Sequence, residues 1–422
     1  MMDADLILTN AREILTCGGP APFAGARQSA VSPLRNATLA ARDGHIVYVG
    51  PAVEAERAVR PTADATVVDA SLYSVVPGFV DAHTHAIFAG DRRDELRRRL
   101  SGATYAEIAA SGGGIVSTVT ATRAASEEAL IAHTRPRLDE MLDGGTTTCE
   151  LKSGYGLDVE SELKMLRAAA ALDASHDIDI EPTFMGAHEI PREYRDRRDA
   201  YVDLVVNEMI PAVARQRLAL WCDVFCETGV FTPAESARIL EAGKQAGLKP
   251  RIHADELAAS GGSIVAAQVG ARSADHLIFA DTNSIAALAR AGVTATLLPN
   301  AAFYLKLGRF APARALIEAG VPVALATDVN PGGGFSPSMA FALALACFAM
   351  NLTFEEALVA ATINGAWSLD IADRAGSLEP GKLADAVVVH GDAINLIRMG
   401  ARPIAAVVKR GRVVRGQEVL HT

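Results

Sequence analysis

Hydrophobic and polar positions follow two rhythms along the chain, and the change of rhythm separates its middle from its ends. Between about residues 75 and 370, short apolar and β-branched runs that end in polar residues alternate with segments whose apolar residues recur every three or four positions. The runs predict eight strands, at 75–85, 146–152, 181–188, 221–227, 250–256, 273–277, 294–299 and 322–328. Eight successive β/α units predict an α/β fold, the (β/α)8 TIM barrel.

Amphipathic segments between the strands predict helices. Their spacing indicates helices over 127–142, 160–172 and 233–246. A further helix over 354–363 follows the last strand, with Thr353 as its N-cap and an end near Gly365. Because active sites of TIM barrels lie at the carboxyl ends of the strands, polar residues there are the first functional candidates.

The two ends of the chain carry short alternating strands around turns. Neither end has enough of them for a stable domain, so we expect both to pair as one small composite β-sandwich beside the barrel. The expected domains are 1–74 and 371–422 for the two parts of this β domain and 75–370 for the barrel. Residues 18–32 are expected to form a loop-like insert.

Composition narrows the class of protein. The chain of 422 residues is 50% hydrophobic and 21% charged, which is ordinary for a globular enzyme. Its net charge of −10 argues against a nucleic-acid or anionic-membrane partner. Five scattered cysteines suggest no disulfide framework and fit the cytoplasm. We expect no secretory leader and no membrane span, because the longest apolar stretch, 339–350, is shorter than the roughly 20 residues required. A homodimer is the default expectation.

Candidate metal ligands stand at strand ends. His83 and His85 alternate, which places both imidazoles on one face at the tip of the first strand. His253 and Asp328 end the fifth and eighth strands. Three imidazoles and one carboxylate suit zinc or a similar divalent ion with a position left for water. Asp328 could instead cap the Asn-Pro-Gly-Gly-Gly turn at 330–334.

A metal ion that lowers the pKa of a bound water toward about 7 favours hydrolysis, and hydrolysis needs a proton carrier. Glu256, three residues beyond His253, could take a proton from water and deliver it to a leaving nitrogen. His276, at the end of the sixth strand, could orient the water or stabilise negative charge on oxygen. A helix-entry carboxylate and a structural histidine are the alternative interpretations.

The motifs at 77–85 and 376–386 resemble the amidohydrolase superfamily over nearly the whole chain. Further stretches resemble, more narrowly, its imidazolonepropionase family of histidine degradation; they are 88–92, 105–115, 150–157, 184–191, 223–227 and 253–256. The resemblance implies hydrolytic opening of the ring of 4-imidazolone-5-propanoate to N-formimidoyl-L-glutamate, with one zinc or iron ion per chain. It implies that His83, His85, His253 and Asp328 hold the metal and that Glu256 is the acid/base residue. A single metal is implied because the fourth strand ends in Cys226-Glu227, where two-metal relatives have a bridging lysine.

The resemblance also implies a set of substrate-contacting positions, which are Arg92, Tyr155, His188, Asn330 and Gly332. A substrate bearing a propionate calls for a guanidinium, and Arg92 follows the first strand closely enough to reach the mouth of the barrel. Tyr105 is a further candidate. Gly333 stands where the family often has a hydroxyl residue, so any contact there is expected from backbone.

Two other functions remain open at this point. A related aminohydrolase of a purine, pyrimidine or other cyclic amidine could use the same ligands, although Arg92 and Tyr155 argue against it because a neutral base needs no carboxylate clamp. A non-catalytic scaffold of the same fold would be free to lose the ligands, and this chain keeps them all.

Overall fold

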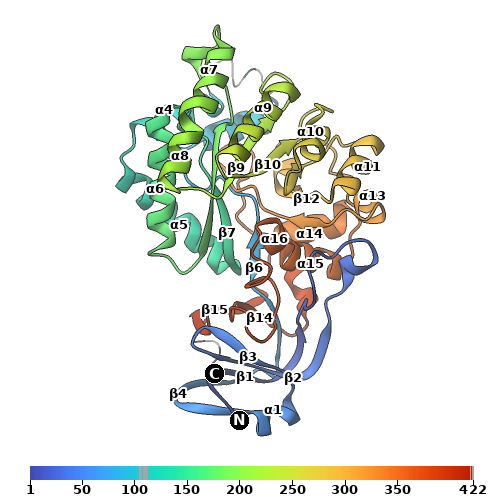
Figure 1. The fold of residues 1–422 in the computed structure, drawn as a ribbon. Coiled ribbons are helices and arrows are strands. Elements are labelled where there is room, and N and C mark those ends of the chain that lie inside the picture. The colour runs from blue at the N-terminus through green and yellow to red at the C-terminus, as the bar shows by residue number, and fades with distance from the viewer. Residues whose placement is uncertain (104–106, 108–112, 419, 421–422) are drawn as a thin grey trace.

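The computed structural model describes residues 1–103, 107, 113–418 and 420, which fold as a barrel with a smaller β domain below it (Figure 1). Eight parallel strands form the barrel in sequential order, each hydrogen-bonded to the next. They are β6 (Phe79–Asp81), β7 (Thr146–Lys152), β8 (Asp179–Ala187), β9 (Trp221–Cys226), β10 (Lys249–Ala254), β11 (Ser273–His276), β12 (Thr294–Leu297) and β13 (Val323–Leu325). The predicted TIM barrel is confirmed.

The barrel closes between the segments that follow β6 and β13. The backbone N–H of Asp328 donates to the carbonyl of His83 (3.1 Å), and the N–H of His85 donates to the carbonyl of Val329 (2.9 Å). Below them, the carboxylate of Asp81 accepts the N–H (2.9 Å) and hydroxyl (2.6 Å) of Thr327. Closure therefore brings the first and last groups of predicted metal ligands side by side.

Helices surround the barrel, as Figure 1 shows. They are α2 (Arg93–Leu100), α4 (Ile115–Ala124), α5 (Glu127–Asp143), α6 (Val159–Asp173), α7 (Arg198–Leu204), α8 (Ile210–Gln216), α9 (Pro233–Gln245), α10 (Gly262–Val269), α11 (Thr282–Ala291), α12 (Pro299–Tyr304), α13 (Ala313–Glu318), α14 (Met339–Ala349), α15 (Phe354–Ala361) and α16 (Ile363–Ser368). Thr353 caps α15, as predicted, and the structure adds a capping box with Glu356. The predicted end near Gly365 is wrong, because Thr362 leaves helical geometry and separates α15 from α16.

Both chain ends build one further sheet. Its strands run in the order β16 (Arg412–Arg415), β15 (Ile404–Lys409), β14 (Ala386–His390), β5 (Tyr73–Pro77), β1 (Met2–Leu15), β2 (Pro33–Arg42) and β3 (His45–Pro51), and β4 (Val59–Asp69) pairs with β1 beside β5. The helix α1 (Ala52–Ala58) joins β3 to β4. Leu6, Leu39, Val388 and Val408 share one apolar cluster, so residues from both ends make a common core. The composite β domain is confirmed.

The predicted first strand, 75–85, is wrong as a single strand. Residues up to Pro77 belong to β5 of the small sheet, and the barrel begins at Phe79. A Cβ atom at Gly78, between them, would overlap the side chain of Thr147 on β7. The chain can pass this point only without a side chain. We therefore propose Gly78 as the junction of the two domains, in place of the expected boundary between residues 74 and 75.

Buried polar contacts hold the small domain against the barrel. The expected loop 18–32 contains a short helix, η1 (Gly25–Ser29), whose buried Gln28 exchanges hydrogen bonds with backbone atoms of Val323 on β13 (2.9 and 3.2 Å). On the other side, buried Lys409 of β15 pairs with Asp385 (2.6 Å) and with Asp179 at the start of β8 (2.9 Å).

The chemistry of the strands explains the pattern read from the sequence. Every residue of β7 is buried, and parallel strands covered on both faces need no polar alternation.

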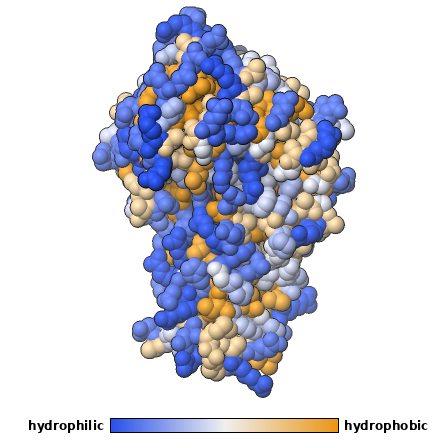
Figure 2. Space-filling model, in the orientation of Figure 1, coloured by the Kyte–Doolittle hydropathy of each residue, from blue (hydrophilic) through white to orange (hydrophobic). Residues whose placement is uncertain are grey.

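Figure 2 shows hydrophilic residues spread over both domains, with hydrophobic ones in small groups between them. No helix within the described part of the chain is long and apolar enough to cross a membrane.

We expect Gly78→Ala to lower the free energy of unfolding by about 1–3 kcal/mol, because the added methyl group meets the Thr147 side chain in a packed interior. Urea unfolding would measure the change. Gly18→Ala is the matched control, since the nearest atoms there belong to the movable side chain of Glu379, 3.1 Å away. Equal stability of the two variants would contradict the packing argument.

Candidate metal centre and active site

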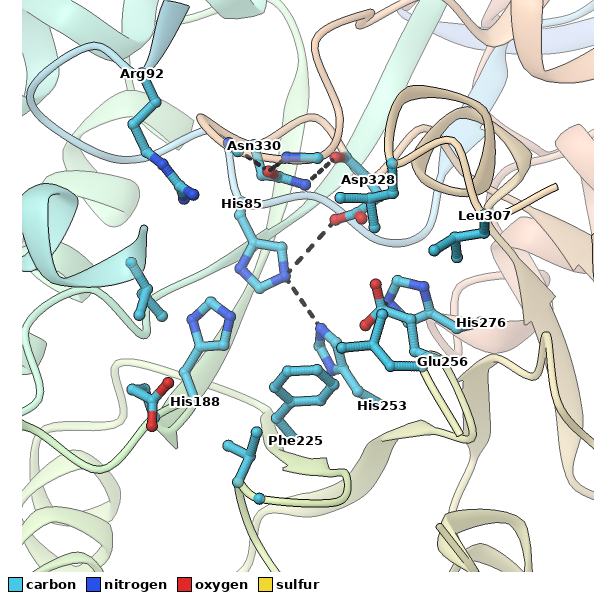
Figure 3. A pocket seen from close by; sticks show the side chains of 18 of the residues that line it. His85, Arg92, His188, Phe225, His253, Glu256, His276, Leu307, Asp328 and Asn330 are labelled. Atoms are coloured by element: carbon cyan, nitrogen blue, oxygen red, sulfur yellow. Dashed lines mark hydrogen bonds and ion pairs between the residues drawn. The ribbon is translucent and has the colours of Figure 1, made fainter. Parts of the chain in front are cut away.

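The carboxyl ends of the barrel strands surround a cavity of about 700 Å³. Polar side chains from several strands point into it (Figure 3). Of the predicted site residues, those lining the cavity are His85, Arg92, Tyr155, His188, His253, Glu256, His276, Asp328, Asn330, Gly332 and Gly333. His83 is fully buried, and its ring centre lies 4.4 Å from that of His253. Tyr105 lies outside the described residues.

Three imidazoles converge at this cavity. His83, His85 and His253 each offer one ring nitrogen, and these nitrogens all lie within 4.8 Å of one another. The Nε2 atoms of His85 and His253 are 3.2 Å apart. Nε2 of His83 is buried and has no hydrogen-bond partner among the described residues. Buried nitrogens that face one another in this way fit a shared divalent cation, so the predicted trio forms a metal-binding site.

Two buried carboxylates set the orientation of these rings. Nδ1–H of His83 donates to Asp275 (2.7 Å), and Nδ1–H of His253 donates to Asp223 (3.1 Å). A carboxylate only accepts, so the proton of each ring is on Nδ1 and the lone pair of Nε2 faces the cavity. Asp223 is on β9 and Asp275 on β11, so the strands on either side of β10 hold the ligands in place.

A buried cation joins the two carboxylates. The ammonium of Lys152, on β7, lies 2.6 Å from Asp223, 2.7 Å from Glu150 and 3.9 Å from Asp275. Arg251, on β10, lies 3.1 Å from Glu150 and 3.3 Å from Asp275. Burial alone raises the pKa of Asp223, but neighbouring His253 and Lys152 more than offset it and hold that pKa well below its usual value. The three carboxylates and two cations thus form one compensated network under the metal site.

Asp328 lies beside the three imidazoles. One carboxylate oxygen is 3.7 Å from Nε2 of His83 and 3.9 Å from Nε2 of His85. Burial raises its pKa to about 7, a shift that nearby positive charge would oppose. Its backbone has φ of +53°, and Asp255 (+51°) and His276 (+74°), at other strand ends, share this left-handed conformation. Asp and His are among the non-glycine residues that adopt this conformation most readily, and it turns the chain at the strand ends.

Glu256 and His276 face each other on the opposite wall from Arg92 (Figure 3). Nε2 of His276 lies 3.6 Å from the carboxyl group of Glu256. Burial, and then the charges of Asp328 and Glu227, raise the pKa of Glu256 well above its usual value. Burial, and then nearby His253, lower the pKa of His276. Burial therefore favours the neutral form of both side chains, whereas a divalent cation bound beside them would favour the carboxylate form of Glu256, which can accept a proton.

Arg92 points into the cavity from the residue before α2. Glu95 holds it through Nε (2.9 Å) and Nη2 (2.8 Å), and the other oxygen of Glu95 accepts the N–H of Gly114 (2.8 Å). A Cβ at Gly332 would overlap the guanidinium, so the glycine lets Arg92 lie against the 330–334 loop. Glu95 and the 330–334 loop therefore both contact the guanidinium of Arg92.

Tyr155 and His188 form the wall next to His85. The rings of His188 and His85 stack with centres 4.8 Å apart, and the Tyr155 ring lies 5.2 Å from that of His188. Nδ1–H of His188 donates to the carbonyl of Gly154 (3.0 Å), which leaves Nε2 as an acceptor. Burial lowers the pKa of His188 to about 3, so this ring is neutral.

Asn330 shapes the loop that closes the cavity. Its side-chain oxygen accepts the N–H groups of Gly332 (2.7 Å) and Gly333 (2.6 Å), and its amide donates to the carbonyl of Asp328 (2.8 Å). The backbone N–H of Gly333 is therefore already engaged. A substrate contact at this position would have to use the carbonyl instead.

The chain resembles known proteins in both sequence and structure. The model of the amidohydrolase family matches residues 74–415. An imidazolonepropionase of Symbiobacterium thermophilum is 49% identical over 98% of both chains, and one of Herpetosiphon aurantiacus is 46% identical over 99% of both. The chain belongs to the imidazolonepropionase family of amidohydrolases. As a member of this family, the chain is a hydrolase acting on carbon–nitrogen bonds. The family is metal-dependent.

Solved structures agree on the fold. An adenosine deaminase of Xanthomonas campestris with bound zinc has a TM-score of 0.70 at 21% identity and covers 99% of this chain and 94% of its own. A triazine hydrolase variant has a TM-score of 0.74 at 19% identity, with coverages of 97% and 94%. At such identities the likeness extends to architecture alone.

The sequence reasoning missed the carboxylates behind the ligands. Asp223 and Asp275 stand inside short buried strands, and Lys152 stands at the end of one. A charged residue within a buried strand needs an opposite charge or hydrogen bonds to compensate the loss of water. Its presence there was the signal that the sequence offered. The sequence could not say which charges pair, because the partners come from different strands.

We expect Asp223→Asn to weaken metal binding by about 10- to 100-fold, because Nδ1 of His253 loses its charged acceptor. Competition with a chelator, followed by metal analysis, would measure the affinity. Glu162→Gln is the control, since this buried carboxylate accepts backbone N–H groups of the 154–157 loop, and none of these hydrogen bonds involves a metal ligand. Unchanged affinity in Asp223→Asn would remove this carboxylate from the metal site.

Proposed function

We propose that the protein hydrolyses the ring carbon–nitrogen amide bond of 4-imidazolone-5-propanoate to N-formimidoyl-L-glutamate in histidine degradation. The observation that carries the proposal is the buried guanidinium of Arg92 in the same cavity as the three imidazoles. This pairing supports a small carboxylate-bearing substrate beside a metal ion. The names of its relatives, imidazolonepropionases at 43–49% identity, point to the same reaction.

The donor set supports one zinc or iron ion, held by His83, His85 and His253 with Asp328 as the fourth ligand. When bound, such an ion polarises a carbonyl and lowers the pKa of water toward about 7. Asp223 and Asp275 keep the ligand rings in the required tautomer. Backbone hydrogen bonds join the segment of His83 and His85 to that of Asp328, so these three residues are held side by side.

The chain's own residues divide the remaining work. Arg92 binds the propionate, and Nε2 of His188 accepts a ring N–H because its other nitrogen already donates to Gly154. Water adds its hydroxyl to the ring carbonyl carbon, and the carbon–nitrogen bond breaks. Glu256 takes the water's proton and delivers it to the leaving nitrogen, while His276 donates a hydrogen bond to the carbonyl oxygen.

The remaining substrate-contacting positions belong to the same proposal. Tyr155, on the wall beside His188, is placed to hydrogen-bond the substrate, and Asn330 holds the loop of Gly332 and Gly333 against it. In this loop Gly333 contributes only backbone.

Location and assembly are part of the proposal. The described cysteines are free and mostly buried, which supports the reducing cytoplasm. Phe348 on α14 is 78% exposed, and Ile394 and Met399 are also exposed; such apolar surface supports a homodimer. The acidic net charge supports a small-molecule substrate with neither nucleic acid nor membrane as partner.

The deciding experiment is steady-state hydrolysis of freshly generated 4-imidazolone-5-propanoate, followed by loss of ring absorbance, with metal content measured on the same sample. Turnover with about one metal ion per chain supports the proposal. A metal-replete protein that leaves this substrate intact would refute it and direct attention to cyclic amidines.

We expect Glu256→Gln to keep its metal and to lose on the order of 100-fold or more in kcat, because the amide can no longer carry the proton. Glu189→Gln is the control, because Glu189 lines the same cavity and accepts the backbone N–H of Ile190. Near-normal turnover by Glu256→Gln would remove its assigned role.

We expect Arg92→Ala to raise KM by about 10- to 100-fold with a smaller change in kcat, because a charge-assisted hydrogen bond to the substrate is lost in the ground state as well as in the transition state. Arg93→Ala is the matched neighbour, since Arg93 is exposed and pairs with Asp91. Initial rates over a range of substrate concentrations would separate the two constants. An unchanged KM in Arg92→Ala would place the propionate elsewhere.

A further inference from the structure

Glu227 is a buried carboxylate that follows β9 directly, and neither the metal nor the substrate needs it in the scheme above. It is 2% exposed. One of its oxygens accepts the backbone N–H groups of Glu256 (3.1 Å) and Leu257 (2.7 Å), and the other accepts the N–H of Thr228 (2.7 Å). Its two oxygens thus serve three N–H donors, two of which belong to the loop that carries the acid/base residue.

The loop of Glu256 is held from its other side by Asp255. The side chain of Asp255 accepts the N–H groups of Gly261 (2.9 Å) and Ser263 (3.2 Å), at the start of α10. Its backbone is left-handed, with φ of +51°, so the chain turns sharply just before Glu256. Glu227 binds the chain immediately after this turn. The backbone around Glu256 is therefore held by two carboxylates, by Glu227 through Glu256 and Leu257 and by Asp255 through Gly261 and Ser263.

We propose that Glu227 is a positioning residue that acts on the reaction through Glu256. The inference rests on the proposed function, in which Glu256 moves the proton. Without an acceptor at Glu227, the N–H groups of Glu256 and Leu257 would lose a buried charged partner, and the turn at Asp255 would relax. A catalytic group displaced by about 1 Å loses much of its effect, because proton transfer depends steeply on distance.

The conservative variant separates position from charge. Glu227→Gln keeps the shape of the side chain and one acceptor oxygen, which can still serve Glu256 and Leu257. Its amide group then faces the N–H of Thr228, at the edge of the cavity. Glu227→Ala removes every acceptor. Kinetic effects should therefore rise from glutamine to alanine.

Glu162 provides a matched comparison at another strand-end loop. It is also a buried carboxylate whose oxygens accept backbone N–H groups of a strand-end loop, those of Gly154 (3.0 Å), Gly156 (2.7 Å) and Leu157 (2.9 Å). That loop carries Tyr155 and supports His188 rather than Glu256. Its removal should raise KM, whereas removal of Glu227 should lower kcat.

The test is a double-mutant cycle with the full-length, metal-loaded enzyme. Glu227→Ala and Glu227→Gln are each made in the wild type and in Glu256→Gln, and kcat, KM and metal content are measured for every protein. In the wild type, Glu227→Ala should lower kcat on the order of 10- to 100-fold with KM and metal content nearly unchanged. In Glu256→Gln the same change should cost less than about threefold, because the group it positions has already been disabled.

Equal losses in both backgrounds, or a rise in KM in place of the fall in kcat, would overturn the inference and leave Glu227 a purely structural residue. If Glu227→Ala fails to fold, the cycle with Glu227→Gln decides, with an expected loss of about threefold in the wild type and none in Glu256→Gln. A wild-type enzyme without turnover overturns the proposed function and this inference together. An active wild type with an uncoupled cycle overturns only the role of Glu227.

Discussion

The site depends on the placement of buried charge inside the barrel. A buried ion is tolerable only if opposite charge and hydrogen bonds compensate it, and five charged side chains from four strands meet this condition for one another. Two of these carboxylates also hold the Nδ1 atoms of His83 and His253. The metal ligands therefore rest on a layer of charged side chains. The positions of these side chains are fixed because their charges must neutralise one another. The hydrogen bonds to Asp275 and Asp223 thus orient the metal-binding nitrogens of His83 and His253 before a metal ion is bound.

Much of the barrel was predictable because its signal is local. Buried parallel strands are short apolar runs, and β7 and β9 begin where the sequence pattern places them. The ligands were predictable for the same reason, since a strand end can be read from its own residues. The division of the first predicted strand was not, because β5 and β6 are equally apolar and differ only in their partners. Those partners, β14 and β7, lie far away in the sequence.

The surroundings of Glu256 show, at the scale of single residues, the same limit on what the sequence can predict. Glu256 stood out because it follows a candidate ligand by three positions. Glu227, 29 residues earlier, has no such mark, and its meaning lies in two N–H groups on a neighbouring strand end. Asn330 shows the reverse case. Its position fits the family pattern, while the structure shows its side-chain oxygen accepting two N–H groups of its own loop and its NH2 group donating to the carbonyl of Asp328. The partners of Glu227 lie 29 and 30 residues away in the sequence, whereas those of Asn330 lie within three residues of it.

The junction at Gly78 has a consequence for biosynthesis. The strand before it, β5, pairs along its whole length with β14, which lies near the other end of the chain. β5 also pairs with β1 at Ser74 and Val75, so during translation the segment that leads into His83 and His85 has one neighbour early, and its β14 neighbour follows only after nearly the entire polypeptide has left the ribosome. A fragment truncated before β14 thereby lacks one of the two neighbours of β5, the strand that leads into the first two ligands.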